Sequence, residues 1–281
     1  VQRMKLVMSV SILCNLLNIF FSFLLAFPAD LGVGGLALGT ALAQYCAVGL
    51  LLVGAVRSQG RILRLLRHDL LWHPPTLLRY FHVGKYLLIR TLLLQAVTLS
   101  FIRYGGLIGV TTLAANSLLM QLFTLFSYFM DGIAYAAEAL VGEAIGAQDR
   151  ARLRRIIPAV LRIGGGLAVV GAVLYAFVPE PFLALLTDKA EVLGRALEFR
   201  YWMALVPLVS FAAFLWDGIL VGATDSRTMG LSMLAAGGAF FVVYLAVIGP
   251  LGAHGLWVAF LSYLGVRSAL VWTLGRRHCR G

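Results

Sequence analysis

The sequence predicts an all-α integral membrane protein with eight transmembrane helices. Of its 281 residues, 61% are hydrophobic and only 12% are charged, whereas a soluble domain carries about 25% charged residues. Eight apolar runs are long enough to cross a hydrocarbon core of about 30 Å as helices. The alternation of polar and apolar residues that marks transmembrane β-strands is absent, so the apolar runs indicate helices.

The eight runs and their connections follow in order along the chain. The runs cover residues 5–27, 35–56, 84–104, 111–142, 159–178, 199–222, 230–248 and 256–275. The longest connection, 57–83, is basic, and Pro74-Pro75 end it before the third run. Two later connections share one pattern, in which a glycine ends one helix and an aspartate, Asp149 or Asp225, caps the next. We expect both aspartates to be structural.

The net charge of +11 gathers on one side of the membrane. If residue 1 faces the cytoplasm, seventeen Lys and Arg residues fall on that side, and four fall on the other: Arg103, Lys189, Arg195 and Arg200. This bias follows the positive-inside rule and places both ends of the chain in the cytoplasm. The positive charge is therefore a topology signal, and we expect no nucleic-acid partner.

An internal repeat relates the two ends of the chain. Residues 31–36 (LGVGGL) align with 251–256 (LGAHGL) at an offset of 220 residues, and Phe20-Phe21 align with Phe240-Phe241 at the same offset. A long repeat in an apolar chain indicates a membrane protein built by duplicating one helical unit. Because only the last hairpin of the first unit is present, about 160 further residues are expected upstream of Val1.

The repeat predicts a division of the chain into three parts. Residues 1–56 are the last two helices of a first lobe, 57–83 form a cytoplasmic linker, and 84–281 form a second, six-helix lobe.

The fourth run carries a polar stripe. At 100° per residue, seven polar side chains of this helix point within about 60° of the direction of Thr124. They are Ser117, Gln121, Thr124, Tyr128, Asp131, Tyr135 and Glu138. The opposite side is apolar, and we expect Leu122, Phe129 and Ile133 to face lipid. One face of this helix therefore suits a water-filled cavity.

Three carboxylic acids fall inside predicted spans. Asp131 and Glu138 are two helical turns apart, about 10 Å along the axis, and Asp217-Gly218-Ile219 repeats Asp131-Gly132-Ile133. A carboxylate near the bilayer centre is paired, protonated or turned toward water. These groups can therefore load protons or bind a cation, or they can hydrogen-bond a neighbouring helix.

Other residues in or near the spans have structural interpretations. Arg90 is expected to reach the cytoplasmic surface, and Arg267 either to do the same or to pair with a carboxylate. Glu143 is expected to be solvated. Three glycine pairs are spaced for helix contacts: Gly35/Gly39, Gly142/Gly146 and Gly218/Gly222.

The sequence indicates neither an enzyme nor a cofactor site. No H-E-x-x-H, G-x-S-x-G or Walker A pattern occurs. The three cysteines do not make a disulfide framework, and His68, His73 and His82 are spaced too loosely for a metal site.

Two motifs carry a family resemblance. The stretch from Ala114 through Gln121 to residues 137–147 (AEALVGEAIGA) resembles the multidrug and toxic compound extrusion (MATE) family, in which the second and eighth helices commonly end in a VGQxLGAG-like run. Residues 217–225 (DGILVGATD) are similar to the tenth helix of the family's DNA-damage-inducible F branch. Glu143 departs from the pattern, since Gln is usual there. The resemblance covers nearly the whole chain, as helices five to twelve of a twelve-helix, two-lobed protein truncated at its N-terminus.

The resemblance implies a bacterial inner-membrane transporter that exports toxic compounds by antiport against H⁺ or Na⁺, with alternating access and without another cofactor. Acidic residues of the second lobe would couple the cation, which maps onto Asp131, Glu138 and Asp217. We expect the substrate cavity to include Gln95, Asn116, Gln121, Thr124, Tyr128 and Tyr135. The expected partners are small cationic amphipathic substrates and membrane lipid, and the expected oligomeric state is a monomer.

Two alternatives remain open. One is a lipid-linked oligosaccharide flippase of the same superfamily, whose cavity would carry several cationic side chains for pyrophosphate. The other is a membrane scaffold without transport activity, which would not need a buried acidic stripe.

The resemblance also implies a further coupling residue. In this branch of the family an acidic residue of the first helix is central to proton coupling, and that helix would lie upstream of Val1.

Overall fold

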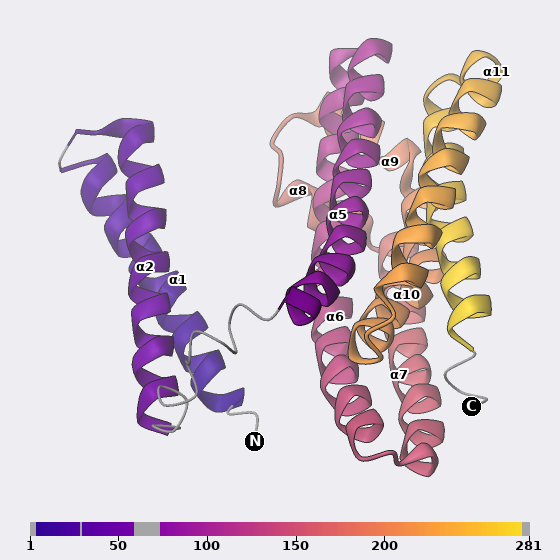
Figure 1. Ribbon diagram of the computed structural model, residues 1–281. Coiled ribbons are helices and arrows are strands. Elements are labelled where there is room, and N and C mark those ends of the chain that lie inside the picture. The colour runs from indigo at the N-terminus through magenta and orange to yellow at the C-terminus, as the bar shows by residue number, and fades with distance from the viewer. Residues whose placement is uncertain (1–3, 29, 59–73, 277–281) are drawn as a thin grey trace. The chain divides into compact units, whose positions relative to one another are not determined.

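The computed structural model describes residues 4–28, 30–58 and 74–276, and this part of the chain is almost entirely helical, without a strand (Figure 1). Its helices are α1 (Met4–Ala26), α2 (Gly32–Ser58), α5 (Pro74–Ile108), α6 (Val110–Gly146), α7 (Arg150–Phe177), α8 (Pro179–Ala184), α9 (Ala190–Glu198), α10 (Arg200–Gly222) and α11 (Ser226–Gly275). Most of the predicted basic linker lies outside the described residues. Proline suits the first turn of a helix, and α5 begins at Pro74.

Among the described residues, seven helices are long and apolar enough to cross a membrane. The difference from the eight predicted spans lies in α11, which has 50 residues and breaks at Gly252, where φ is 51° and ψ is −126°. Its two halves pack against each other, since Tyr263 Oη donates a hydrogen bond to Met233 Sδ at 3.3 Å. The halves match the last two predicted spans, so each predicted span coincides with a helix or half-helix.

The chain divides into two compact units between Leu77 and Leu78. In the first unit, α1 and α2 form a hairpin that turns at Gly32. The turn has the same backbone signature as the break in α11, because φ is 49° at Gly32 and 51° at Gly252, 220 residues later. Glycine adopts positive φ without steric strain. The sequence repeat therefore carries a shared local conformation.

A second glycine of the repeat lets the helices of each hairpin approach closely. A β-carbon at Gly35 would lie 2.5 Å from the carbonyl group of Leu25, and one at Gly255 would lie 2.8 Å from the carbonyl oxygen of Val247. Side chains at either position would force the two helices apart. The aligned aromatic pairs also share an edge-to-face arrangement: Phe20 with Phe21, and Phe240 with Phe241.

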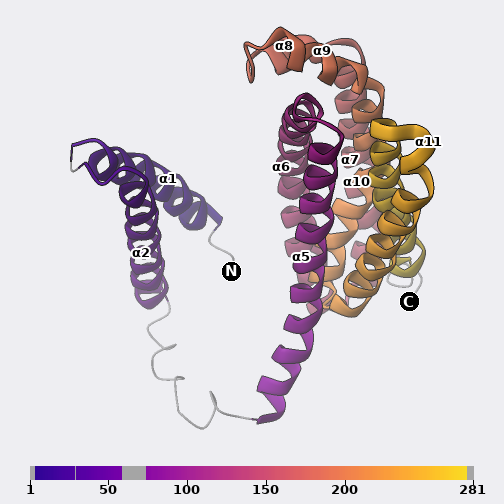
Figure 2. The same cartoon turned by 90° about the horizontal axis from the view of Figure 1, so that it is seen from above.

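Helix α10 is the centre of the second unit. It contacts α6, α7 and α11, and most of its side chains are buried. Large aromatic residues fill the surrounding core, including the fully buried Trp216, Trp257 and Phe260. The short helices α8 and α9 lie together at one end of the bundle, where α9 contacts α6 (Figure 2). Burying this apolar surface favours association of the helices.

Glycines bring the backbones of α6 and α10 into contact. A β-carbon at Gly222 would lie 2.6 Å from the carbonyl oxygen of Glu138, and Gly218 is packed just as closely against the carbonyl group of Ala134. Small residues four apart permit this approach. The predicted contact role is confirmed for these two glycines and for Gly142, which faces Gly222, whereas Gly146 meets no neighbour.

Helices α6 and α10 end in the same way. The backbone N–H groups of Asp149 and Asp225 each donate to the carbonyl five residues earlier, at 2.9 and 2.8 Å, which is the long hydrogen bond of a Schellman motif. Their carboxylates then cap the next helix, accepting from the N–H of Arg152 at 2.9 Å and of Thr228 at 3.2 Å. The predicted structural roles of both aspartates are confirmed.

We predict that Thr224→Gly stabilises the protein. Thr224 occupies the left-handed position of its motif with φ 57°, and a β-branched residue is strained there by about 1 kcal/mol. Thermal unfolding of the purified protein, followed by intrinsic fluorescence, should show a higher midpoint.

The matched control is Ala223→Gly, because Ala223 is right-handed with φ −81°. Glycine there relieves no strain and increases the entropy of the unfolded chain, so the midpoint should fall. Equal shifts in the two variants would refute the strain at Thr224.

Candidate functional site

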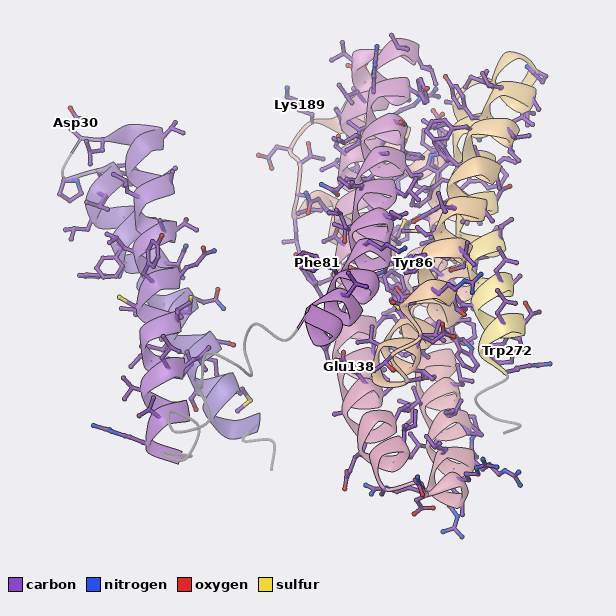
Figure 3. The ribbon with its side chains drawn as sticks, in the orientation of Figure 1. Asp30, Phe81, Tyr86, Glu138, Lys189 and Trp272 are labelled. Carbon is purple, nitrogen blue, oxygen red and sulfur yellow. The ribbon has the colours of Figure 1, made fainter. Side chains whose placement is uncertain are left out.

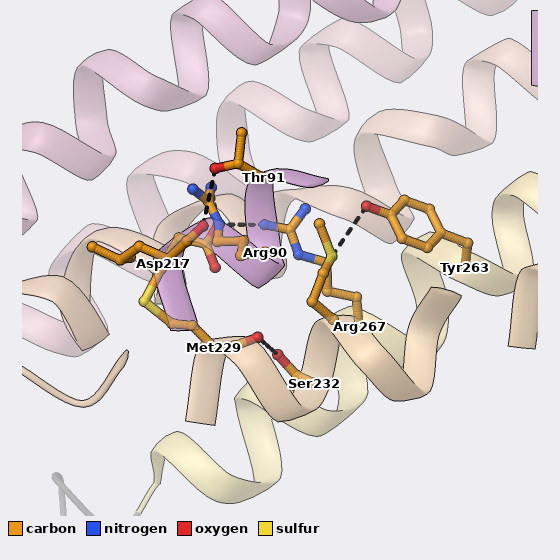
Figure 4. Close-up of polar contacts among 9 residues, drawn as sticks. Arg90, Thr91, Asp217, Met229, Ser232, Tyr263 and Arg267 are labelled. Atoms are coloured by element: carbon orange, nitrogen blue, oxygen red, sulfur yellow. Dashed lines mark hydrogen bonds and ion pairs between the residues drawn. The ribbon is translucent and has the colours of Figure 1, made fainter. Parts of the chain in front are cut away.

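One carboxylate inside the second unit is shared by two arginines (Figure 4). Arg90 on α5 donates to Oδ2 of Asp217 on α10, from Nη2 at 2.6 Å and from Nε at 3.1 Å. Arg267, on the second half of α11, donates from Nη2 to the same oxygen. These three residues form what we call the ionic cluster. It joins helices from the beginning, the middle and the end of the unit.

The ionic cluster is mostly buried. The side chains of Arg267 and Asp217 are 3% and 9% exposed, whereas that of Arg90 is 28% exposed. An unpaired charge in this environment would cost several kcal/mol, so removing one partner is strongly unfavourable. The guanidinium of Arg267 also lies 5.9 Å from the centre of the Phe214 ring, close enough for a cation–π contact. Two guanidinium groups and one carboxylate give the cluster a charge of +1.

Asp131 on α6 is a fourth charged group at this site. It interacts electrostatically with Arg90, Asp217 and Arg267. Its side chain is half-buried, and it belongs to none of the ion pairs found in the described part of the chain. When Asp131 is ionised, its charge balances the +1 of the ionic cluster. The protonation state of Asp131 therefore sets the net charge of the four groups at this site.

The polar stripe of α6 has an exposed part and an edge. Tyr128 and Tyr135 are 68% and 66% exposed, and Gln121 is exposed beside them. Asp131 and Glu138 are half-buried, and the backbone of Glu138 lies against α10. Figure 3 shows Glu138 on the α6 ribbon. The stripe thus combines exposed aromatic and amide groups with two less accessible carboxyls.

The apolar side of α6 differs in part from the prediction. Phe129 is 58% exposed, but Leu122 is only 3% exposed and belongs to the core, so the prediction that Leu122 faces lipid is wrong. Its backbone carbonyl accepts a hydrogen bond from Tyr175 Oη of α7 at 2.9 Å. Ile133 is partly buried and packs on the same core. Neighbouring helices cover most of the side opposite the stripe, so little of it remains open to lipid.

The two arginines deepest inside predicted spans, Arg90 and Arg267, both pair with Asp217. The expectation that Arg90 reaches the membrane surface is wrong, because its guanidinium points to α10 instead. Arg267 was predicted either to reach the membrane surface or to pair with a carboxylate, and it pairs with Asp217. Arg90 was the partner that sequence reasoning missed. The available signal was its depth, since only Arg90 and Arg267 of the 23 Lys and Arg residues lie more than four residues from either end of a predicted span.

The other predicted positions lie apart from the ionic cluster. Gln95 is exposed on α5, and the hydroxyl of Thr124 donates to the Met120 carbonyl of its own helix at 2.8 Å. Asn116 is fully buried, and its Oδ1 accepts from Trp257 Nε1 at 3.3 Å. It therefore lies in the core and not on the exposed face that Gln121, Tyr128 and Tyr135 share.

Glu143 is solvated, as predicted, and accepts two hydrogen bonds from Arg152 at 3.0 and 2.9 Å. Within residues 4–28, 30–58 and 74–276, no three His, Cys, Asp or Glu side chains gather as a metal site would require.

Multi-pass transporters typically consist of membrane-spanning helices with paired ionisable groups in the interior of the bundle. This unit has such a pair of ionic contacts, with the partly exposed carboxyl of Asp131 beside them. Comparison with known proteins makes this assignment specific. The chain belongs to the MatE family of multidrug and toxic compound extrusion transporters, whose family model matches residues 87–248.

Individual relatives agree with this assignment. The chain is 32% identical over 271 residues to DNA damage-inducible protein F of Escherichia coli (strain K12), which covers 95% of this chain and 58% of the relative. It is 29% identical over 288 residues to the probable multidrug resistance protein NorM of Rhizobium meliloti (strain 1021), covering 95% and 60%.

Solved structures support the fold. A crystal structure of a mutant of the Vibrio cholerae MATE transporter VcmN matches with a TM-score of 0.85 at 14% identity, covering 97% of this chain and 62% of that chain. The chain therefore spans about three fifths of the length of these relatives.

We predict that the charges of the ionic cluster are energetically coupled. Asp217→Asn leaves two buried guanidinium groups without a counter-charge and should lower the free energy of unfolding by about 3 kcal/mol. Adding Arg267→Met removes one of the uncompensated charges and should restore part of the loss. Thermal or denaturant unfolding of the two single variants and the double variant measures the coupling energy.

The exposed pair Glu143–Arg152 provides the control. Glu143→Gln and Arg152→Met should each change stability by less than about 1 kcal/mol, with little coupling. If Asp217→Asn and Arg267→Met destabilise additively, the ionic cluster does not act as a unit.

Proposed function

We propose that the complete protein exports small cationic amphipathic compounds by antiport against H⁺ or Na⁺, with alternating access. Membership of the MatE family supports export, as do the names of its relatives. Since the chain spans about three fifths of their length, the proposal concerns the complete protein. The observation that carries the cation coupling is the position of Asp131, an accessible carboxyl in the field of the buried ionic cluster.

Loading of Asp131 changes the forces among the helices of the second unit. An ionised Asp131 attracts Arg90, the most exposed member of the ionic cluster. A proton or a sodium ion on Asp131 removes that attraction. At an effective dielectric constant of 20, two neighbouring unit charges interact by an energy on the order of 3 kcal/mol. A change of this size shifts an equilibrium between two conformations by about a hundredfold.

The same face of α6 suits a cationic substrate. Tyr128 and Tyr135 present exposed rings, and aromatic faces attract ammonium groups and other organic cations. Asp131 and Glu138 supply the negative charge. Because the substrate and the coupling ion would compete for the same carboxyls, occupancy by one favours release of the other. This competition is the simplest basis for exchange.

The members of the acidic set have different roles in this proposal. Asp217 is engaged by two guanidinium groups, so it anchors the ionic cluster and gives Asp131 its electrostatic environment. Asp131 and Glu138 are the more accessible carboxyls, and they are the ones that would exchange ions. The proposed coupling ion is the only cofactor.

The alternatives are less well supported. A flippase for pyrophosphate-linked lipids needs several free cationic side chains within its central cavity, whereas the two arginines at the interior site, Arg90 and Arg267, both pair with Asp217. A membrane scaffold has no need for a partly exposed carboxyl beside buried charges. We further propose that the protein is a monomer in the bacterial inner membrane. We propose that both ends of the chain are cytoplasmic, because basic residues gather on that side.

We predict that Asp131→Asn and Glu138→Gln each strongly reduce gradient-driven efflux in the complete protein. Both changes keep the size of the side chain and remove the ionisable group. The expected loss is roughly tenfold or more, the size of a typical coupling between two sites. Efflux of cationic dyes from vesicles with an imposed H⁺ or Na⁺ gradient, normalised to protein level, measures it, and the effective gradient identifies the ion.

Glu143→Gln is the matched control. It removes the same charge from the same helix at an exposed position, so it should transport at nearly the normal rate. Normal efflux in both Asp131→Asn and Glu138→Gln would mean that these carboxyls only hold helices together.

A further inference from the structure

A groove of about 430 Å³ lies away from the ionic cluster, between α7, α10 and α11. It is lined by Ile157, Pro158, Leu161, Arg162, Trp216, Trp272 and Arg276. Trp216 lies in the core, and its ring packs edge to face against that of Trp272 at 6.2 Å between centroids. The groove therefore has rigid aromatic walls and is not part of the exposed face of α6.

The lining of the groove is amphipathic. Aliphatic and aromatic side chains form most of it, and the two exposed guanidinium groups of Arg162 and Arg276 are its only charges. Neither arginine has an acidic partner in the part of the chain that the structure describes. The guanidinium of Arg276 lies 4.9 Å from the centre of the Trp272 ring. Arg162 Nε donates to the carbonyl of Pro158 in its own helix at 3.3 Å. Two cations without a counter-charge among the described residues, beside an apolar groove, match a ligand with an anionic head and an apolar tail.

The groove also lies at the depth expected for a lipid headgroup. Helix α7 has 28 residues, so it is about 42 Å long, and it exceeds a hydrocarbon core of about 30 Å. The four arginines of residues 150–155 place the excess of about 12 Å at the N-terminal end of α7. Arg162, about 18 Å from the first residue, then lies about 6 Å inside the hydrocarbon core, a depth from which an arginine side chain reaches the interface. Figure 3 shows Trp272 in the lower part of α11, in the half of the unit whose lower end carries many nitrogen-bearing side chains.

We propose that this groove binds one anionic phospholipid. Its phosphate lies between Arg162 and Arg276, and an acyl chain packs along Ile157, Leu161 and Trp272. A free phosphate ion would leave the apolar walls uncovered, and a zwitterionic lipid would bring a second cation toward two arginines. A bound lipid fills the space between α7 and α11 and so braces the basic end of the bundle. This proposal does not depend on the proposed transport function.

The test is lipid binding to the complete protein in neutral detergent, titrated by native mass spectrometry. Phosphatidylglycerol is the anionic probe and phosphatidylcholine the zwitterionic one. The wild-type protein should retain phosphatidylglycerol preferentially. In Arg162→Gln/Arg276→Gln this affinity should fall by about 30-fold, because each basic side chain near an anionic surface contributes a factor of about five. Phosphatidylcholine binding should not change.

The matched control is Arg150→Gln/Arg227→Gln. It removes two exposed positive charges that do not line the groove, so its phosphatidylglycerol affinity should stay within about twofold of wild type if the effect is local. Equal losses in the two double variants would overturn the site in favour of a diffuse charge effect, as would the absence of any lipid preference in the wild type.

Two further measurements test the apolar part of the groove. Leu161→Trp fills the groove and keeps both arginines, so it should weaken phosphatidylglycerol binding, and an unchanged affinity would contradict the placement of the acyl chain. Inorganic phosphate, added as a competitor, should displace little lipid. Full displacement by phosphate would show that the groove binds only an anion.

Discussion

The carboxylate of Asp217, buried in an apolar helix bundle, is the constraint on which the second unit depends. Its partners, Arg90 and Arg267, come from the first and the last helices of the unit. Apolar packing is non-directional and tolerates many arrangements of similar helices, whereas a buried charge without its partner is strongly unfavourable. The ion pairs therefore tie α5 and α11 to α10, whereas α6 and α7 pack on α10 without an ion pair to it among the described residues.

The glycines of α10 bring a further helix, α6, close to the ionic cluster. Gly218 and Gly222 allow the backbone of α6 to lie directly on α10, and this approach brings Asp131 into the field of the buried charges. Larger residues would move α6 outward and weaken that field, since Coulomb energy falls with distance. The charge of Asp131, which is partly exposed, thus acts on the buried charges of the ionic cluster.

Sequence reasoning was most accurate where the chemistry is local. Apolar runs, helix caps such as Asp149 and the hairpin repeat are encoded in adjacent residues, so their positions could be predicted. The partner of Arg90 and the burial of Leu122 depend on which helix lies alongside, and helical periodicity gives only the direction of a side chain. The short helix α9 escaped notice because its nine residues are amphipathic and produce no apolar run. The burial and the partners of the Arg90 and Leu122 side chains depend on the helices that pack against them, and helical periodicity in the sequence does not identify those helices.

The break at Gly252 has a consequence for biosynthesis. Because the two halves of α11 join without an intervening loop, they can enter the bilayer from the translocon together, as one helical hairpin. The second half carries Arg267, and an arginine at the centre of a helix opposes insertion by about 3 kcal/mol. The strongly apolar first half can offset this penalty only if the two insert together. By then α5 and α10 have already been synthesised. Asp217 is therefore available to pair with the guanidinium of Arg267 as soon as that group enters the membrane.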